Sequence, residues 1–149
     1  MDSVDWVVIG AGLVGLQSAR RIKETYPHQR VLVVDDNAVN REALILYLKS
    51  RGIDAVGADG AEEARLYLHY QKRIGLMITD LRMQPESGLD LIRTIRASER
   101  AALSIIVVSG DTDVKEAVDV MHLGVVDFLL KPVDLGKLLE LVKKELKIG

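Results

Sequence analysis

The feature that most constrains the fold of this chain is the alternation of short apolar runs with longer stretches of helical period. Most of the short runs are apolar at consecutive positions, as in strands that helices cover on both faces. Six such runs lie at residues 6–9, 31–34, 54–57, 76–79, 104–108 and 126–130. In the longer stretches apolar residues recur at spacings of three and four, as in Leu135, Leu138, Leu139, Val142 and Leu146. The pattern predicts an α/β fold with three layers, in which right-handed helical crossovers join six parallel strands.

Composition favours one globular domain over residues 1–149 and argues against several classes of function. Of the 149 residues 48% are hydrophobic and 28% are charged, which is typical of a folded chain. The absence of cysteine excludes disulfides and thiolate metal sites and is compatible with a reducing cytoplasm. A net charge of -2 supplies no basic field for nucleic acid or an anionic membrane. We therefore expect a cytoplasmic protein without a nucleic-acid or membrane partner.

The first apolar run leads directly into three glycines, Gly10, Gly12 and Gly15. At a strand-to-helix junction this spacing permits a tight turn, close approach of a pyrophosphate, and close packing of helix on strand. The next strand ends in Asp35, 20 residues after Gly15, where a carboxylate can hold ribose hydroxyls. Residues 4–36 resemble the opening unit of FAD-dependent oxidoreductases, which implies FAD or NAD bound by these four residues. The alternative is that the glycines only form a tight turn.

A second group of polar residues follows the ends of the later predicted strands. In chain order these residues are Asp35, Asp36, Asp80, Ser109 and Lys131. The carboxyl ends of strands in an open parallel sheet line the crevice where ligands bind. Carboxylates gathered there repel one another unless a cation joins them, and hard oxygen ligands suit Mg²⁺. A hydroxyl and an ammonium group are suited to hold phosphoryl oxygens. For single members the alternative is a helix cap, as at Asp36 or Asn37.

This constellation resembles the receiver domain of two-component response regulators over residues 31–149. The resemblance implies that Asp80 accepts a phosphoryl group from a histidine kinase. It also implies an Mg²⁺ site formed by Asp35, Asp36 and Asp80 with the backbone carbonyl of Arg82.

The same resemblance gives roles to three residues near the end of the sheet. Ser109 matches the hydroxyl that follows the phosphoryl group, and Lys131 matches the lysine that precedes a proline that is often cis. Phe128 matches the aromatic switch residue, although a core role is equally compatible with its sequence context. One departure lies between Met83 and Gly88, where the proline of the family pattern is displaced by one position to Pro85.

Residues 1–30 supply one βα unit more than a receiver needs, joined without a linker to the receiver-like residues 31–149. Such a seamless join is typical of an engineered chimera. If residues 6–9 enter between 31–34 and 76–79, the six strands take the Rossmann order 3-2-1-4-5-6. That arrangement would separate the carboxylates and disrupt the phosphoryl site. The alternative keeps the flavodoxin-like receiver order 2-1-3-4-5 and adds the extra strand at an edge. We favour the central position.

Three functions therefore compete. The favoured one is an engineered flavodoxin-like/Rossmann chimera derived from a receiver, and the alternatives are a functional phosphorelay receiver and a dinucleotide-binding module. None of the three is an enzyme in the ordinary sense.

Overall fold

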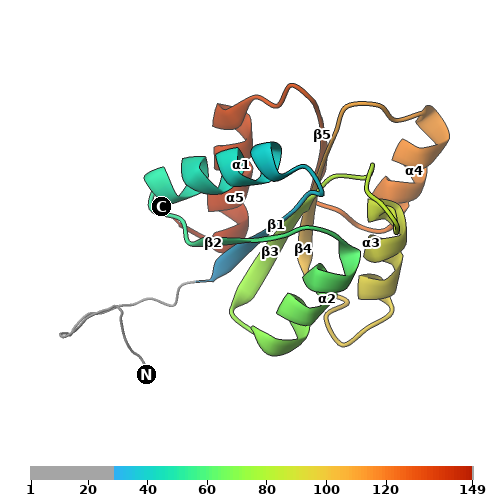
Figure 1. The fold of residues 1–149 in the computed structure, drawn as a ribbon, viewed down its shortest axis with the longest axis horizontal. Helices are drawn as coiled ribbons and strands as arrows, with labels where there is room; N and C mark the ends of the chain where they lie inside the picture. Colours follow the sequence, from blue (N-terminus) through green and yellow to red (C-terminus); the bar gives the residue numbers. More distant parts are fainter. Residues whose placement is uncertain (1–28, 149) are drawn as a thin grey trace.

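The computed structural model describes residues 29–148, which form a parallel sheet covered by helices on both faces (Figure 1). The strands are β1 (Arg30–Val34), β2 (Ala55–Ala58), β3 (Ile74–Thr79), β4 (Ser104–Ser109) and β5 (Asp127–Leu130). The helices are α1 (Ala38–Ser50), α2 (Ala61–Tyr70), α3 (Gly88–Arg96), α4 (Val114–His122) and α5 (Leu135–Leu146). Within this part of the chain the five predicted strands are all present, and the sheet order is β2-β1-β3-β4-β5.

The predicted six-stranded Rossmann order is wrong. Strand β1 pairs directly with β3, with Val31 opposite Leu76 and Val34 opposite Thr79. Its other edge pairs with β2. Because both edges of β1 are already hydrogen-bonded, no strand can enter between β1 and β3. The flavodoxin-like order expected as the alternative is the one observed.

The predicted extra strand at residues 6–9 lies outside the described residues. The same is true of most of the 1–30 unit, so the division of the chain at residue 30 stays a prediction.

Two apolar cores hold the three layers together. One lies between the sheet and helices α1 and α5, and it includes Val31, Leu48 and Leu138. The other lies between the sheet and helices α2, α3 and α4, which cover the opposite face (Figure 1). Strand residues must therefore be apolar on both sides, which explains the consecutive apolar runs in the sequence.

Polar side chains determine where four of the helices begin. The side chains of Asn37, Ser87, Asp113 and Asp134 each accept a hydrogen bond from a backbone N–H in the first turn of the helix that follows. The cap of α1 is thus Asn37, one of the two residues considered from the sequence. Since these helices start beyond the carboxyl ends of the strands, the capped turns surround the edge of the sheet where the candidate site lies.

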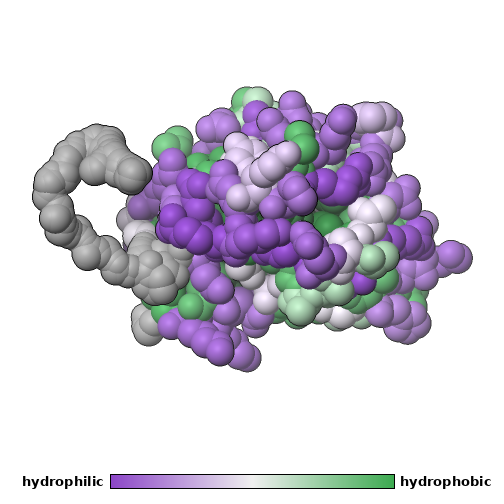
Figure 2. All heavy atoms as spheres, turned by 90° about the horizontal axis from the view of Figure 1, so that it is seen from below, coloured by the Kyte–Doolittle hydropathy of each residue, from purple (hydrophilic) through white to green (hydrophobic). Residues whose placement is uncertain are grey.

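The surface is largely hydrophilic, with apolar side chains in separate patches on the face shown in Figure 2. None of the helices within residues 29–148 combines the length and the hydropathy that spanning a membrane requires.

Candidate functional site

The predicted acceptor Asp80 lies at the carboxyl edge of the sheet together with other predicted site residues. Asp35 follows β1, Asp80 follows β3, and Ser109 is the last residue of β4. Each aspartate is only 8% exposed, and Ser109 is fully buried. Because β1, β3 and β4 are consecutive in the sheet, strand pairing alone places these three residues side by side. The structure therefore brings together three of the five residues that the sequence predicted to converge.

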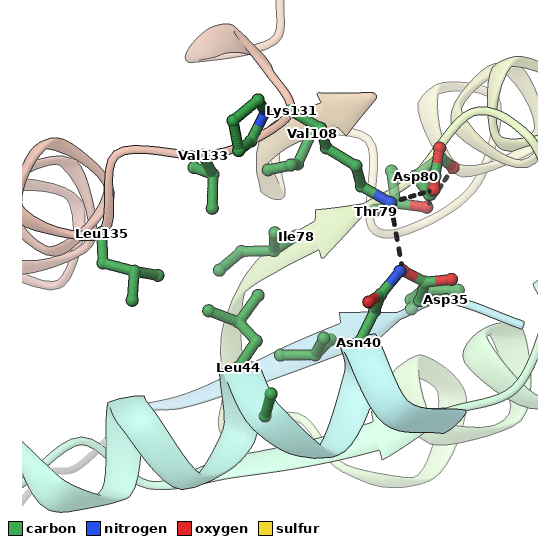
Figure 3. Close-up of a pocket in the computed structure, with 14 residues that line it drawn as sticks. Asp35, Asn40, Leu44, Ile78, Thr79, Asp80, Val108, Lys131, Val133 and Leu135 are labelled. Atoms are coloured by element: carbon green, nitrogen blue, oxygen red, sulfur yellow. Dashed lines mark hydrogen bonds and ion pairs between the residues drawn. The ribbon is translucent and has the colours of Figure 1, made fainter. Parts of the chain in front are cut away.

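Lys131 joins the two buried carboxylates (Figure 3). Its Nζ lies 2.7 Å from Oδ2 of Asp80 and 3.6 Å from Oδ2 of Asp35. Burial alone would lower the pKa of Lys131, but its hydrogen bond to Asp80 and the charges of Asp80 and Asp35 outweigh burial and raise that pKa. The side chain is thus held as an ammonium ion at the centre of the site.

Backbone N–H groups orient the remaining carboxylate oxygens. Oδ1 of Asp80 accepts a hydrogen bond of 3.0 Å from the backbone N–H of Arg82, and Oδ1 of Asp35 accepts one of 2.9 Å from Asn37. Asp36 is exposed, and its Oδ2 accepts from the backbone N–H of Gln84 at 3.3 Å. This contact directs Asp36 toward the loop between β3 and α3, the same loop that holds the acceptor.

The donor chemistry of this edge fits Mg²⁺. Asp35 and Asp80 supply hard carboxylate oxygens, and both contact the ammonium of Lys131. Mg²⁺ needs only one or two carboxylates because it keeps several of its waters. In the part of the chain that the structure describes, no three His, Cys, Asp or Glu side chains are grouped to hold a metal as they stand. The ligand set predicted from the resemblance, with Asp36 and the carbonyl of Arg82, therefore stays a prediction.

Two hydroxyl groups in the segment from the end of β4 to the start of α4 have no hydrogen-bond partner within residues 29–148. The Oγ of Ser109 and the Oγ1 of Thr112 are both buried and unpaired. Ser109 is tied to the lysine through the backbone, since its carbonyl accepts from the N–H of Lys131 at 3.1 Å. Most buried hydroxyls in folded proteins have a hydrogen-bond partner, so these two are available to an incoming polar group.

Phe128 is half-buried and packs against the core on the side of helices α2, α3 and α4. The structure thus shows the core role that the sequence left open, and its role as a switch stays a prediction. Gly10, Gly12 and Gly15, predicted to bind a dinucleotide, lie outside the described residues.

Sequence reasoning missed Thr79, whose side chain binds the backbone of the acceptor Asp80. Its buried hydroxyl donates to the backbone carbonyl of Asp80 at 2.9 Å. Only its place next to Asp80 could have indicated this contact.

Sequence reasoning noted Gly88 at the end of the loop after Asp80 but did not predict its close contact with that residue. A Cβ at Gly88 would lie 2.1 Å from the carbonyl oxygen of Asp80, so only glycine allows α3 to begin so close to the acceptor. The peptide bonds before Pro85 and Pro132 are both cis.

An apolar cleft of about 270 Å³ opens from the carboxylates toward α1 and the segment that precedes α5 (Figure 3). Leu44, Ile78 and Val133 line its apolar part, while Asp35, Asp80 and Lys131 form its polar end. The acceptor is therefore reached from a surface that offers both apolar and charged contacts.

Comparison with known sequences establishes the family. The response regulator receiver domain family matches residues 31–143, and the chain belongs to this family. The chain is 93% identical to a response regulator receiver protein from Pseudomonas putida, whose crystal structure superposes with a TM-score of 0.79. That alignment covers 80% of this chain and 99% of the other chain.

Longer relatives carry the same unit. The chain is 36% identical over 121 residues to the response regulator protein PilR of Pseudomonas aeruginosa, which covers 80% of this chain and 26% of PilR. It is 37% identical over 116 residues to the transcriptional regulatory protein FixJ of Azorhizobium caulinodans. That alignment covers 78% of this chain and 54% of FixJ. The chain thus spans about a quarter of one relative and about half of the other.

These comparisons favour the functional receiver that the sequence left as an alternative. They give no support to an engineered chimera or to FAD or NAD binding by Gly10, Gly12, Gly15 and Asp35.

Proposed function

We propose that this chain is a phosphorelay receiver that accepts a phosphoryl group on Asp80 from a histidine kinase. The observation that carries the proposal is the ammonium of Lys131, which lies 2.7 Å from the buried carboxylate of Asp80. Ser109, whose buried hydroxyl has no partner among the described residues, ends the neighbouring strand β4. A buried carboxylate flanked by a cation and a free hydroxyl is prepared to receive an anionic group.

In the proposed transfer, an oxygen of Asp80 attacks the phosphorus of a phosphohistidine. The new O–P bond forms as the P–N bond breaks, and the electron pair of that bond remains with the imidazole, which keeps or gains a proton from solvent. The ammonium of Lys131 and the hydroxyl of Ser109 hold the phosphoryl oxygens as charge moves onto them. Asp80 is consumed as a substrate, so the chain itself is not an enzyme in the ordinary sense.

Receiver domains use Mg²⁺, which neutralises charge on the transferred phosphoryl group when it is bound. Here we assign its binding to Asp35, Asp36, Asp80 and the carbonyl of Arg82. Asp35 also has a second task, because its contact with Lys131 helps to hold the ammonium beside Asp80. The expected cytoplasmic location and the lack of nucleic-acid and membrane partners stay predictions.

The proposal is tested by treating the whole chain with acetyl phosphate in the presence of Mg²⁺ and measuring its mass. Wild-type protein should gain the mass of one phosphoryl group, and Asp80→Asn should abolish that gain. Asp59→Asn is the matched control, because Asp59 is an exposed aspartate between β2 and α2. If Asp80→Asn is modified as readily as the wild type, the acceptor assignment is wrong.

A further inference from the structure

Arg82 connects the acceptor to helix α4. Its backbone N–H donates to Oδ1 of Asp80, while its Nε donates to the carbonyl of Asp111 at 2.8 Å. Its guanidinium then reaches Glu116 in the first turn of α4. One residue therefore spans from the acceptor carboxylate, across the loop that follows Ser109, to the helix beyond.

The contact with Glu116 has two points. Nη1 of Arg82 donates to Oε2 of Glu116 at 3.1 Å, and Nη2 lies 2.8 Å from Oε1 as an ion pair without hydrogen-bond alignment. The Glu116 side chain is only 16% exposed, whereas that of Arg82 is 50% exposed. The arginine is the more exposed partner, so it is the side chain that can move more easily.

The segment crossed by this arginine contains two hydroxyl groups that could donate to an anion. These are the buried hydroxyls of Ser109, the last residue of β4, and of Thr112. Thr112 precedes Asp113, which caps α4 through the backbone N–H of Glu116 at 2.7 Å. Movement of this loop toward a bound anion would therefore pull on the turn that holds Glu116.

We propose that the guanidinium of Arg82 exchanges Glu116 for the phosphoryl group when Asp80 is modified. This inference rests on the proposed function, and it adds the route by which modification reaches α4. A phosphoryl group brings a charge of about -1.5 to -2 and three strong acceptor oxygens, so it offers the guanidinium more charge and more acceptors than one carboxylate does. In the unmodified protein Glu116 competes for the guanidinium and holds the loop in place.

The competition makes a prediction that is opposite to that of a purely structural ion pair. If Glu116 only stabilises the fold, Glu116→Gln should leave anion binding unchanged or weaken it. If Glu116 competes, Glu116→Gln should tighten beryllofluoride binding by about fivefold or more, since coupling between sites is typically of that size. The gain arises because the guanidinium no longer has to leave a charged partner.

The experiment is a double-mutant cycle on the whole chain, with beryllofluoride titrated in excess Mg²⁺ and followed by backbone amide shifts. Arg82→Met should weaken binding, and on that background Glu116→Gln should have no further effect. Arg82→Lys, which keeps the charge but lacks the planar fork, should fall between wild type and Arg82→Met. In free Glu116→Gln the amide signals of residues 114–122 should move toward their positions in the loaded wild type.

Asp119→Asn is the matched control. Asp119 lies on the same helix and pairs with Lys115 and Arg93, so this change removes a charge from α4 but leaves the Arg82–Glu116 contact in place. Its beryllofluoride affinity should equal that of the wild type. Additive effects of the two substitutions, or equal tightening by Asp119→Asn, would overturn the exchange while leaving the acceptor assignment intact. A wild-type chain that does not respond to beryllofluoride would overturn both proposals.

Discussion

Gly88, the first residue of α3, lies against the backbone of the acceptor Asp80. Replacing Gly88 by alanine tests how tight this contact is. A Cβ at this position would lie 2.1 Å from the carbonyl oxygen of Asp80 and 2.8 Å from the Cα of Leu81. Both neighbours are backbone atoms, so no side chain can rotate away. The loop and the helix would have to separate by about 1 Å to restore an ordinary carbon–oxygen contact near 3.3 Å.

The cost follows from the rigidity of both partners. Overpacking a filled interior typically costs about 1–3 kcal/mol, and here the upper end applies because the strand end and the helix must both move. We therefore expect Gly88→Ala to lower the free energy of unfolding by about 3 kcal/mol. With a urea m value of about 2 kcal/mol/M for a domain of this size, the midpoint should fall by about 1.5 M.

Urea unfolding followed by circular dichroism measures this change. Gly60→Ala is the matched control, since the nearest atom to its added Cβ is 4.0 Å away, and its midpoint should stay close to that of the wild type. Because the same displacement shifts Asp80, acceptance of phosphoryl from acetyl phosphate should also slow in Gly88→Ala. A midpoint within about 0.3 M of the wild type would refute the claim that only glycine fits between α3 and the acceptor.

Two pH dependences follow from the ion pairs. The folded-state pKa of Lys131 is raised, so its stabilising contribution is complete at neutral pH and is lost as the pH rises through that value, above about 10.4. Lys131→Met should lower the free energy of unfolding by about 1 kcal/mol at pH 7, and urea midpoints should show this deficit shrinking near pH 11. The hydrogen bond from Arg65 lowers the pKa of Glu86 in the folded state. The pair therefore stabilises the fold above pH about 4.3, and this stabilisation is lost as the pH falls through the folded-state pKa. Glu86→Gln should cost less than about 1 kcal/mol at pH 7, and a deficit that persisted at pH 2.5 would contradict this cause.

Local pattern was enough to place the strands. The run at 104–108 became β4, Ser104–Ser109, and the run at 31–34 became β1, Arg30–Val34. The reason is that both faces of the sheet are covered, so a buried strand must be apolar at every position. The polar residues of the site, such as Asp35 and Asp80, could be predicted for a related reason. A polar residue directly after such a run lies at the ligand-binding edge of a parallel sheet.

The identity of each strand's neighbour could not be obtained in this way. Alternating βα units are common to the Rossmann and flavodoxin-like orders, and both orders place Asp35 and Asp80 at strand ends. The orders differ in whether β1 touches β3, and that depends on packing over the whole sheet. The structure pairs Val34 with Thr79, and this pairing is what places Asp35 and Asp80 within reach of one lysine.

The sequence by itself determined the class of fold, the five strands of the described part of the chain, and the polar residues Asp35, Asp80, Ser109 and Lys131, because these depend on periodicity and on the chemistry of strand ends. Only the tertiary structure decided the strand order and the contact between Arg82 and Glu116, which are 34 residues apart. Such contacts depend on the relative placement of whole elements, to which every buried side chain contributes. No short stretch of sequence carries that information.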